Sequence, residues 1–205
     1  MSHRKFTRAA SAAIALALAV GLAACSNDDL AQQYQSGDNK GYIAGQFQVQ
    51  EYHGSGRPPV VKYSGTLDDG KSVTYADYAG KVTVVNFWYA GCAPCRQEAG
   101  QLEKSYRGFA GKDVAFLGVN TYDQAATAQS FASAHGVTYP SIIDVGSKSA
   151  TSAFADIVPL SATPVTVVLD AQGRPTARII GEIQDASILS ALIQTALTES
   201  ANGTS

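Results

Sequence analysis

Apolar residues along the chain form short continuous runs that alternate with stripes of helical spacing. The run from Val82 to Trp88 is almost continuously apolar, which predicts a central strand that is covered on both faces. The next stretch predicts a helix from about Ala93 to Phe109, because its apolar positions recur every three or four residues. The positions that form this predicted buried stripe are Cys95, Ala99, Leu102, Tyr106 and Phe109.

The alternation of strands and helices continues toward the C-terminus. A second apolar run, Val114 to Val119, predicts another strand. Asp123 is placed to cap a helix that reaches about His135, and Asp185 is placed to cap a last helix. Between these helices the pattern predicts a strand at Tyr139–Asp144, a short helix at Lys148–Asp156, and strands at Val165–Leu169 and Thr176–Ile180.

A hairpin is predicted ahead of the central strand. The runs Val60–Leu67 and Ser72–Tyr75 flank Asp68-Asp69-Gly70, which is a turn signal. From Val82 onward the alternation predicts parallel strands, and the closing pair of strands adds antiparallel neighbours. The pattern therefore predicts an α/β sandwich with a mixed central sheet and an N-terminal β-hairpin extension.

The first 24 residues have the pattern of an export signal. A basic segment ending at Arg8 precedes sixteen mostly apolar residues, fewer than the roughly 20 that a membrane-spanning helix needs. The sequence Leu22-Ala23-Ala24-Cys25 resembles the lipobox of bacterial lipoproteins, in which the cysteine thiol is joined to diacylglycerol and the signal is removed before it. The alternative is an ordinary signal peptide cut near Ala24, with Cys25 an incidental thiol.

Residues 26–59 are polar and glycine-rich, and we predict that they form a flexible tether. A flexible chain of 34 residues has an end-to-end distance of about 30 Å. A short strand around Ile43 to Val49 is the alternative inside this segment. The expected organisation is a lipoprotein signal peptide at 1–24, a lipid-anchored tether at 25–59 and a folded domain at 60–205.

Composition and charge narrow the class of protein. The chain has 205 residues, of which 45% are hydrophobic and 16% charged, and its formal net charge is −2. These values suit one globular domain with appendages and argue against a coiled coil. No run of basic residues offers the surface that nucleic-acid binding needs. Three cysteines are too few for a disulfide scaffold or for a zinc site of four thiolates, so no metal is expected.

The sequence Cys92-Ala93-Pro94-Cys95 lies where the predicted central strand ends and the first long helix begins. A helix N-terminus presents unpaired N–H groups and about half a positive charge, which stabilises a thiolate. Cys92 is therefore the predicted nucleophile, and Cys95, one turn further, is predicted to be shielded. The alternatives are a zinc knuckle, which two cysteines do not close, and a static disulfide, which usually closes a longer loop.

Several motifs stand in a characteristic order along the chain. They are Gly65-Thr66-Leu67 with Gly80-Lys81, Val84-Val85-Asn86-Phe87-Trp88, the Cys-x-x-Cys pair, and Thr163-Pro164 before a strand. In this combination they resemble the thioredoxin superfamily, most closely its membrane-tethered extracytoplasmic TlpA/ResA-like reductases. The resemblance implies a thioredoxin-like α/β/α sandwich over residues 60–205, with a redox-active Cys92–Cys95 disulfide and no cofactor.

The resemblance also implies roles for residues outside the cysteine pair. Pro164 is expected to be a cis-proline facing the disulfide, which turns the Thr163 backbone toward the cysteines for pairing with an extended substrate segment. The expected substrate-binding residues are thus Thr163, Pro164 and Trp88. Glu98, on the flank of the buried stripe, is expected to have a raised pKa and to shape the reactivity of the thiols. The alternative is a solvated glutamate that is favoured near the helix N-terminus.

The function that the resemblance favours is a lipid-anchored extracytoplasmic thiol–disulfide oxidoreductase, which reduces protein disulfides such as those of apocytochrome c during haem attachment. Its expected partners are protein thiols and disulfides, a membrane electron donor of the thiol-relay type, and the membrane through the lipid on Cys25. Two other functions stay open: an oxidant that donates disulfides to exported proteins, and a binding lipoprotein without turnover. Gly91, where many relatives have tryptophan, opens the rim of the site and leaves partner specificity undefined.

Overall fold

The computed structural model describes residues 47–159 and 162–203, so the predicted signal peptide, Cys25 and most of the predicted tether lie outside the described residues. Within these two ranges no helix is long and apolar enough to cross a membrane. The strands are β1 (Gln48–Glu51), β2 (Ser64–Thr66), β3 (Ser72–Thr74), β4 (Val82–Trp88), β5 (Val114–Asn120), β6 (Ser141–Ile143), β7 (Val165–Leu169) and β8 (Pro175–Ile180). The α-helices are α3 (Ala93–Gly108), α4 (Ala125–His135), α5 (Ser149–Ala153) and α6 (Ala186–Ala201).

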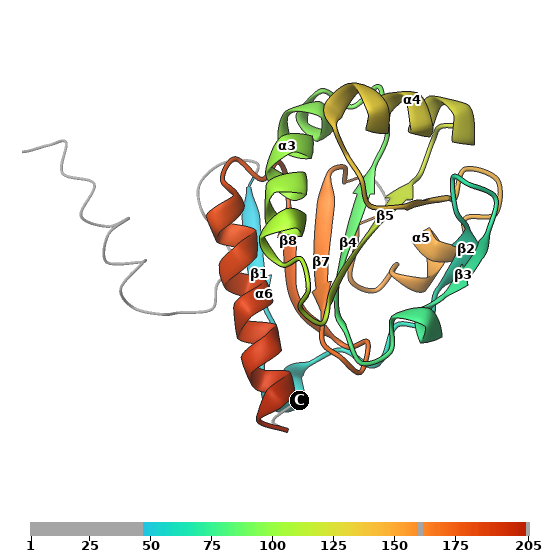
Figure 1. Ribbon diagram of the computed structural model, residues 1–205. Helices are drawn as coiled ribbons and strands as arrows, with labels where there is room; N and C mark the ends of the chain where they lie inside the picture. Colours follow the sequence, from blue (N-terminus) through green and yellow to red (C-terminus); the bar gives the residue numbers. More distant parts are fainter. Residues whose placement is uncertain (1–46, 160–161, 204–205) are drawn as a thin grey trace, which may run out of the picture. The chain divides into compact units, whose positions relative to one another are not determined.

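The larger sheet has six strands in the order β1-β8-β7-β4-β5-β6, and β2 and β3 form a separate two-stranded sheet (Figure 1). β4 pairs in parallel with β5 and antiparallel with β7. All seven residues of β4 are buried, which explains why its sequence is a continuous apolar run rather than an alternating one. The mixed sheet and the separate hairpin confirm the predicted fold class, a thioredoxin-like α/β fold.

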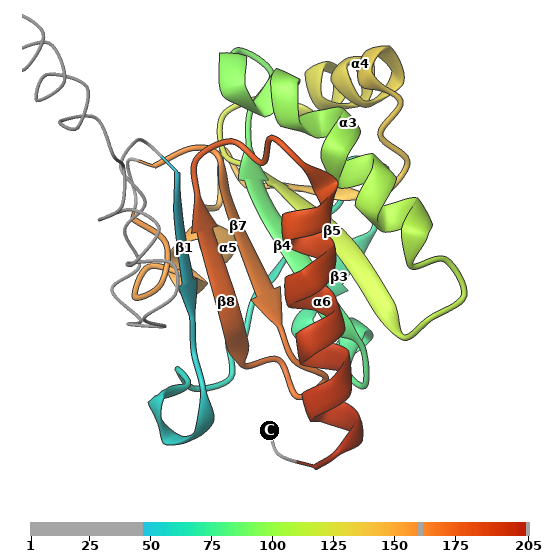
Figure 2. The same cartoon turned by 90° about the vertical axis from the view of Figure 1, so that its left-hand side faces the viewer.

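Helices and the hairpin cover the two faces of the larger sheet (Figure 2). α3 and α6 pack together on one face, where Leu102 and Val84 belong to the same buried cluster. On the other face, the residues around α5 and the β2–β3 hairpin pack with Val85 and Phe87 of β4. Because successive side chains of a strand point to opposite faces, Asn86 is on the same side as Val84 and faces α3.

The start of α4 differs from the prediction. The helix has Gln124 at its N-cap position, and the carboxylate of Asp123 accepts hydrogen bonds from Ala90 N–H (2.6 Å) and Asn120 Nδ2 (2.9 Å) instead. The predicted cap is therefore wrong, because this carboxylate accepts from Ala90, 33 residues earlier, and from the Asn120 side chain in place of the N–H groups of the helix. Two other predicted helix ends are confirmed: α4 ends at His135, where Gly136 has φ at 69°, and Asp185 accepts the N–H of Ser187 at the start of α6. The short helix predicted at Lys148–Asp156 is α5, which spans only Ser149–Ala153.

Residues 48–51 correct the predicted boundary between tether and folded domain. They form β1, which pairs antiparallel with β8 along its whole length. Arg57 lies in the same predicted tether, yet its side chain is only 2% exposed and forms ion pairs with Asp170 and Glu199. The described part of the predicted tether thus belongs to the folded domain, because backbone pairing and ion pairs hold it where apolar residues are few.

Candidate active site

Cys92 and Cys95 lie where the loop after β4 leads into α3. Cys92 is the N-cap residue of α3, and its Sγ atom accepts a hydrogen bond from Cys95 N–H at 3.2 Å. Pro94 stands in the first turn, where a backbone N–H has no partner inside the helix. The two cysteines form a disulfide with their Cα atoms 5.3 Å apart. The predicted pair is therefore assembled at a helix N-terminus, where N–H groups and the helix dipole stabilise a thiolate.

Solvent exposure does not separate the two cysteines in the disulfide state. Cys95 is 2% exposed, as expected, but Cys92 is only 4% exposed and less open than predicted. The two differ in their surroundings, because Cys95 continues the buried stripe of Ala99 and Leu102 whereas the Cys92 sulfur caps the helix. The helix N-terminus thus favours Cys92 as the thiolate of the pair.

Glu98 is buried on the next turn of α3, with 1% of its surface exposed. Its carboxylate accepts hydrogen bonds from Asn86 Nδ2 (2.9 Å) and from Ile183 N–H (3.0 Å). The Asn86 amide also donates to Thr166 Oγ1 on β7 at 3.0 Å, which fixes its orientation. Burial raises the pKa of Glu98 to about 7, although both hydrogen bonds favour the charged form. The predicted rise in pKa is confirmed, and the alternative of a solvated glutamate is wrong.

The Thr163–Pro164 peptide bond is cis, as predicted. It directly precedes β7, whose Val165 pairs with Phe87 of β4. Because β4 and β7 are antiparallel, this register places Pro164 next to Trp88, the residue from which the chain continues toward the cysteines. The cis-proline and the cysteine loop therefore lie at the same end of the sheet.

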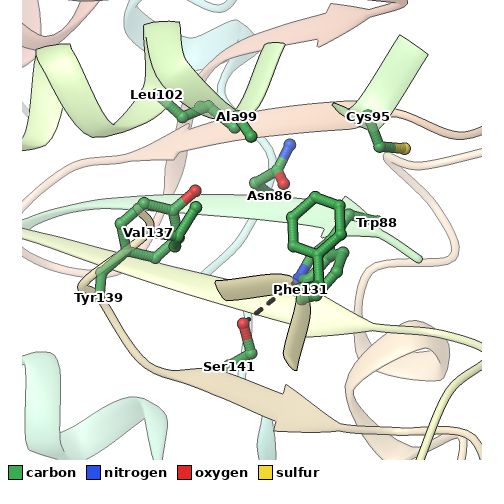
Figure 3. Close-up of a pocket in the computed structure, with 9 residues that line it drawn as sticks. All are labelled: Asn86, Trp88, Cys95, Ala99, Leu102, Phe131, Val137, Tyr139 and Ser141. Carbon is green, nitrogen blue, oxygen red and sulfur yellow. Dashed lines mark hydrogen bonds between the residues drawn. The ribbon is translucent and has the colours of Figure 1, made fainter. Parts of the chain in front are cut away.

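Trp88 lies inside the protein, which corrects its predicted contact with substrate. It is 6% exposed, its indole N–H donates to Ser141 Oγ at 3.2 Å, and its ring centroid lies 4.4 Å from that of Phe131 (Figure 3). A cavity of about 10 Å³, room for about one water molecule, lies among these side chains, Cys95 and Tyr139. We therefore assign Trp88 to the packing behind Cys95 rather than to the binding surface.

Comparison with known protein families matches the Redoxin model to residues 54–193. The chain belongs to the Redoxin family. The matched residues include the cysteine pair, Glu98 and the cis-proline. Membership in the Redoxin family fits the predicted enzyme class, a thiol–disulfide oxidoreductase in which the Cys92–Cys95 pair carries the chemistry, and the family uses a cysteine pair without a cofactor. Within residues 47–159 and 162–203, no group of three or more His, Cys, Asp or Glu side chains is placed to hold a metal ion.

Individual Redoxin relatives are distant. The thiol–disulfide oxidoreductase ResA of Bacillus subtilis (strain 168) is 27% identical over 120 residues, which is 58% of this chain and 64% of ResA. The chain thus spans less than two thirds of the length of the curated ResA proteins that it matches. The crystal structure of a DsbF homologue from Corynebacterium diphtheriae is 32% identical and covers 75% of this chain and 96% of its own, with a TM-score of 0.63. A secreted thiol–disulfide isomerase from Corynebacterium glutamicum is 29% identical and covers 75% and 93%, with a TM-score of 0.66.

Two side chains that fix the cysteine loop of this Redoxin domain escaped the sequence prediction. The Asp123 carboxylate accepts the N–H of Ala90, two residues before Cys92, and Asn120 donates to the same carboxylate oxygen. Asn120 Oδ1 in turn accepts the backbone N–H groups of Tyr122 and Asp123. The sequence does carry a signal for this turn, because Asn120 ends a buried strand and Asp123 follows three residues later. Asn and Asp side chains commonly accept hydrogen bonds from the backbone of their own turn.

Glu98→Gln is expected to reduce the dependence of folding stability on pH. The pKa of Glu98 rises from 4.5 to about 7 on folding, so the folded state keeps a proton that the unfolded state loses. The stabilisation is therefore complete below pH 4.5 and is lost as the pH rises through 7, by about 3 kcal/mol. Urea unfolding of the wild type and the variant at about pH 4.5 and about pH 8 measures this difference.

Glu103→Gln on the same helix is a control of opposite sign. Burial alone would raise the pKa of Glu103, but hydrogen bonds from Arg107 and Thr138 outweigh burial and lower it. Its contribution to stability is therefore present above its ordinary pKa and lost as the pH falls. The prediction for Glu98 would be contradicted if the wild type and Glu98→Gln showed the same pH dependence of unfolding. Glu98 would then be charged in the folded protein at pH 5 to 6, and its pKa would not be raised.

Proposed function

We propose that this Redoxin-family protein is an extracytoplasmic thiol–disulfide oxidoreductase that reduces disulfides in other proteins. The observation that carries the proposal is the position of Cys92, whose sulfur caps α3 and accepts the N–H of Cys95. A helix N-terminus stabilises a thiolate at Cys92, and Cys95 lies within bonding distance for the second step.

In the reducing direction the protein enters the reaction as a dithiol. The Cys92 thiolate attacks one sulfur of the partner disulfide, which forms a mixed disulfide and releases the other partner sulfur as a thiolate that takes up a proton. The Cys95 thiolate then attacks the Cys92 sulfur, which releases the second partner thiolate and leaves the Cys92–Cys95 disulfide. Two electrons and two protons pass to the partner, and a membrane electron donor of the thiol-relay type restores the dithiol.

Glu98 is the proposed acceptor of the Cys95 proton. It follows Cys95 by three residues on α3, and burial raises its pKa to about 7, so that it can take up and release a proton near neutral pH. Asn86 and Ile183 hold its carboxylate in place. At the same end of the sheet, Thr163 and the cis-proline Pro164 are proposed to pair with an extended segment of the partner.

The substrate and the location are proposed from the sequence and the relatives. The TlpA/ResA-like motifs of the sequence favour apocytochrome c during haem attachment as the substrate. The match to ResA, named a thiol–disulfide oxidoreductase, supports the class of reaction. The export signal and the lipobox cysteine Cys25 favour a lipid anchor that holds the protein on the outer side of the cytoplasmic membrane. The Corynebacterium glutamicum relative, described as secreted, agrees with a position outside the cytoplasm.

The opposite direction of electron flow is the second candidate, because one solved relative is described as a thiol–disulfide isomerase. The DsbF homologue and the thiol–disulfide isomerase are 32% and 29% identical and match over 96% and 93% of their own chains. ResA matches over only 64% of its length. An isomerase or oxidant of exported proteins would use the same Cys92–Cys95 pair, poised at a higher reduction potential.

The reduction potential of the Cys92–Cys95 pair decides between the two directions. It is measured by equilibration in glutathione or dithiothreitol buffers, with the fluorescence of Trp88, the single tryptophan of the chain, as the signal. We expect a potential below about −250 mV, close to that of thioredoxin at about −270 mV. A value above about −200 mV, in the range of isomerases and oxidants, would refute the reductase.

A further inference from the structure

Tyr122 is an unusually open aromatic residue beside the cysteine loop. Its exposed fraction is 73%, and the only other exposed large hydrophobic residue within 47–159 and 162–203 is Val60, at 36%. A single exposed tyrosine needs no explanation by itself. Tyr122 differs from such a residue because hydrogen bonds fix the backbone of its turn and the ring of Tyr89 packs against its own ring.

The turn that carries Tyr122 is fixed by hydrogen bonds on both sides. Asn120 Oδ1 accepts the backbone N–H of Tyr122 at 3.1 Å. The preceding Thr121 donates its N–H to Trp88 O (3.1 Å), and its carbonyl accepts from Lys148 Nζ (3.0 Å). These bonds hold the backbone of Tyr122 in a set position relative to the end of β4.

Tyr89 connects Tyr122 to the reactive cysteine. The two tyrosine rings lie against each other with centroids 5.7 Å apart. The carbonyl of Tyr89 accepts the N–H of Cys92 at 3.2 Å. Gly91 lies between Tyr89 and Cys92 in the sequence and has no side chain that would cover the two tyrosine rings. We call Tyr89 and Tyr122 the aromatic platform.

We propose that the aromatic platform determines which disulfides the protein attacks, by binding an aromatic or large apolar side chain next to the target cysteine of a partner polypeptide. This inference rests on the proposed function. A partner sulfur that reaches Cys92 brings its neighbouring residues over Tyr89 and Tyr122, because the platform is hydrogen-bonded to the same loop. Aromatic rings gain from offset or edge-to-face contacts beyond the area that they bury.

A polypeptide segment fits the platform better than a second copy of the chain or a lipid surface does. A stable dimer buries about 800 Å² on each partner, whereas the exposed large hydrophobic surface of the described residues at this end is one tyrosine. Insertion into a membrane interface likewise needs a wide apolar face. The single exposed ring of the platform, Tyr122, offers a surface that matches one side chain next to a target cysteine.

The test compares three disulfides as substrates of the reduced protein: oxidised glutathione, a disulfide-linked dimer of a glycine–serine peptide with one cysteine, and the same dimer with phenylalanine on both sides of each cysteine. Trp88 fluorescence follows the reaction, and each peptide rate constant is divided by the glutathione rate constant of the same protein. For the wild type we expect the phenylalanine peptide to react about five- to tenfold faster than the glycine–serine peptide. Tyr122→Ala is expected to bring this ratio below about twofold.

Two further variants separate recognition from a general loss of structure. Tyr122→Phe keeps the ring and is expected to keep the preference. Val60→Ala removes the other exposed hydrophobic residue, which adjoins the turn at Gly173 at the opposite end of the sheet, and is expected to react like the wild type with all three disulfides. A wild-type ratio near one, or a full ratio in Tyr122→Ala, would overturn the inference while glutathione reduction leaves the proposed function standing. A wild type that reduces none of the three disulfides would refute the proposed function and the inference with it.

Discussion

A Cys95→Ser variant is expected to hold partner proteins in mixed disulfides through Cys92, whereas a Cys92→Ser variant is expected to hold almost none. The Cys92 sulfur caps α3, so its thiolate is the one that the helix N-terminus stabilises. Cys95 lies in the stripe of buried residues with Ala99 and is placed to attack Cys92 from within the chain. Such intramolecular steps have effective concentrations of about 10⁵ M or more, so their removal slows partner release by orders of magnitude.

Non-reducing gels of cells that produce each variant, run with and without dithiothreitol, measure this trapping. The double variant without either thiol is the control for contacts that are not disulfides. Both cysteines are nearly buried in the disulfide state, so the difference between the variants does not follow from exposure and tests the helix N-terminus directly. Partners that accumulate on Cys95 in the Cys92→Ser protein would contradict the assignment of Cys92 as the nucleophile.

The parts of the site that the sequence predicted correctly depend on short stretches of chain. A continuous apolar run specifies β4, and a helical stripe specifies α3, so the position of Cys92 between them follows from about 28 consecutive residues. The raised pKa of Glu98 follows in the same way, because its spacing from Cys95 places it beside the buried stripe. The cis bond at Pro164 came from the resemblance to a known family, since periodicity carries no information about it.

The parts that were wrong or absent depend on contacts between distant segments. Trp88 belongs to the predicted strand, but its burial is decided by Phe131 and Ser141, which reach it from α4 and β6. Asp123 satisfies every local rule for a helix cap, yet its carboxylate accepts a hydrogen bond from the N–H of Ala90, 33 residues earlier. A hydrophobic pattern records which side chains are buried and leaves the partners of polar groups open.

Arg57 shows the same limit more strongly, and it leads to the prediction with the largest effect on stability. Its polar, glycine- and proline-rich neighbourhood predicts a linker, whereas its guanidinium reaches the carboxylate of Asp170, 113 residues away, at 3.4 Å. Asp170 also accepts from Arg174 Nε (3.2 Å) and from the backbone N–H groups of Gln172 (3.0 Å) and Arg174 (2.8 Å). Arg57 in addition pairs with Glu199 of α6, so an ionic network centred on the buried side chains of Arg57 and Asp170 joins the N-terminal segment, the β7–β8 turn and the last helix.

Asp170→Ala is expected to lower the free energy of unfolding by about 3 to 5 kcal/mol, because it removes the buried carboxylate that pairs with the buried Arg57 guanidinium and with the half-buried Arg174. Urea unfolding of the oxidised protein measures this loss, and Asp170→Asn, which keeps the shape and removes the charge, separates the ionic contribution from the turn. The matched control is Asp69→Ala, which removes a 2.7 Å ion pair with Lys71 in an exposed hairpin turn and is expected to change stability little. Because Asp170 lies at the opposite end of β7 from Pro164, the reduction potential of the cysteine pair is expected to stay the same. Equal unfolding curves for Asp170→Ala and Asp69→Ala would show that the network does not hold the N-terminal segment on the domain.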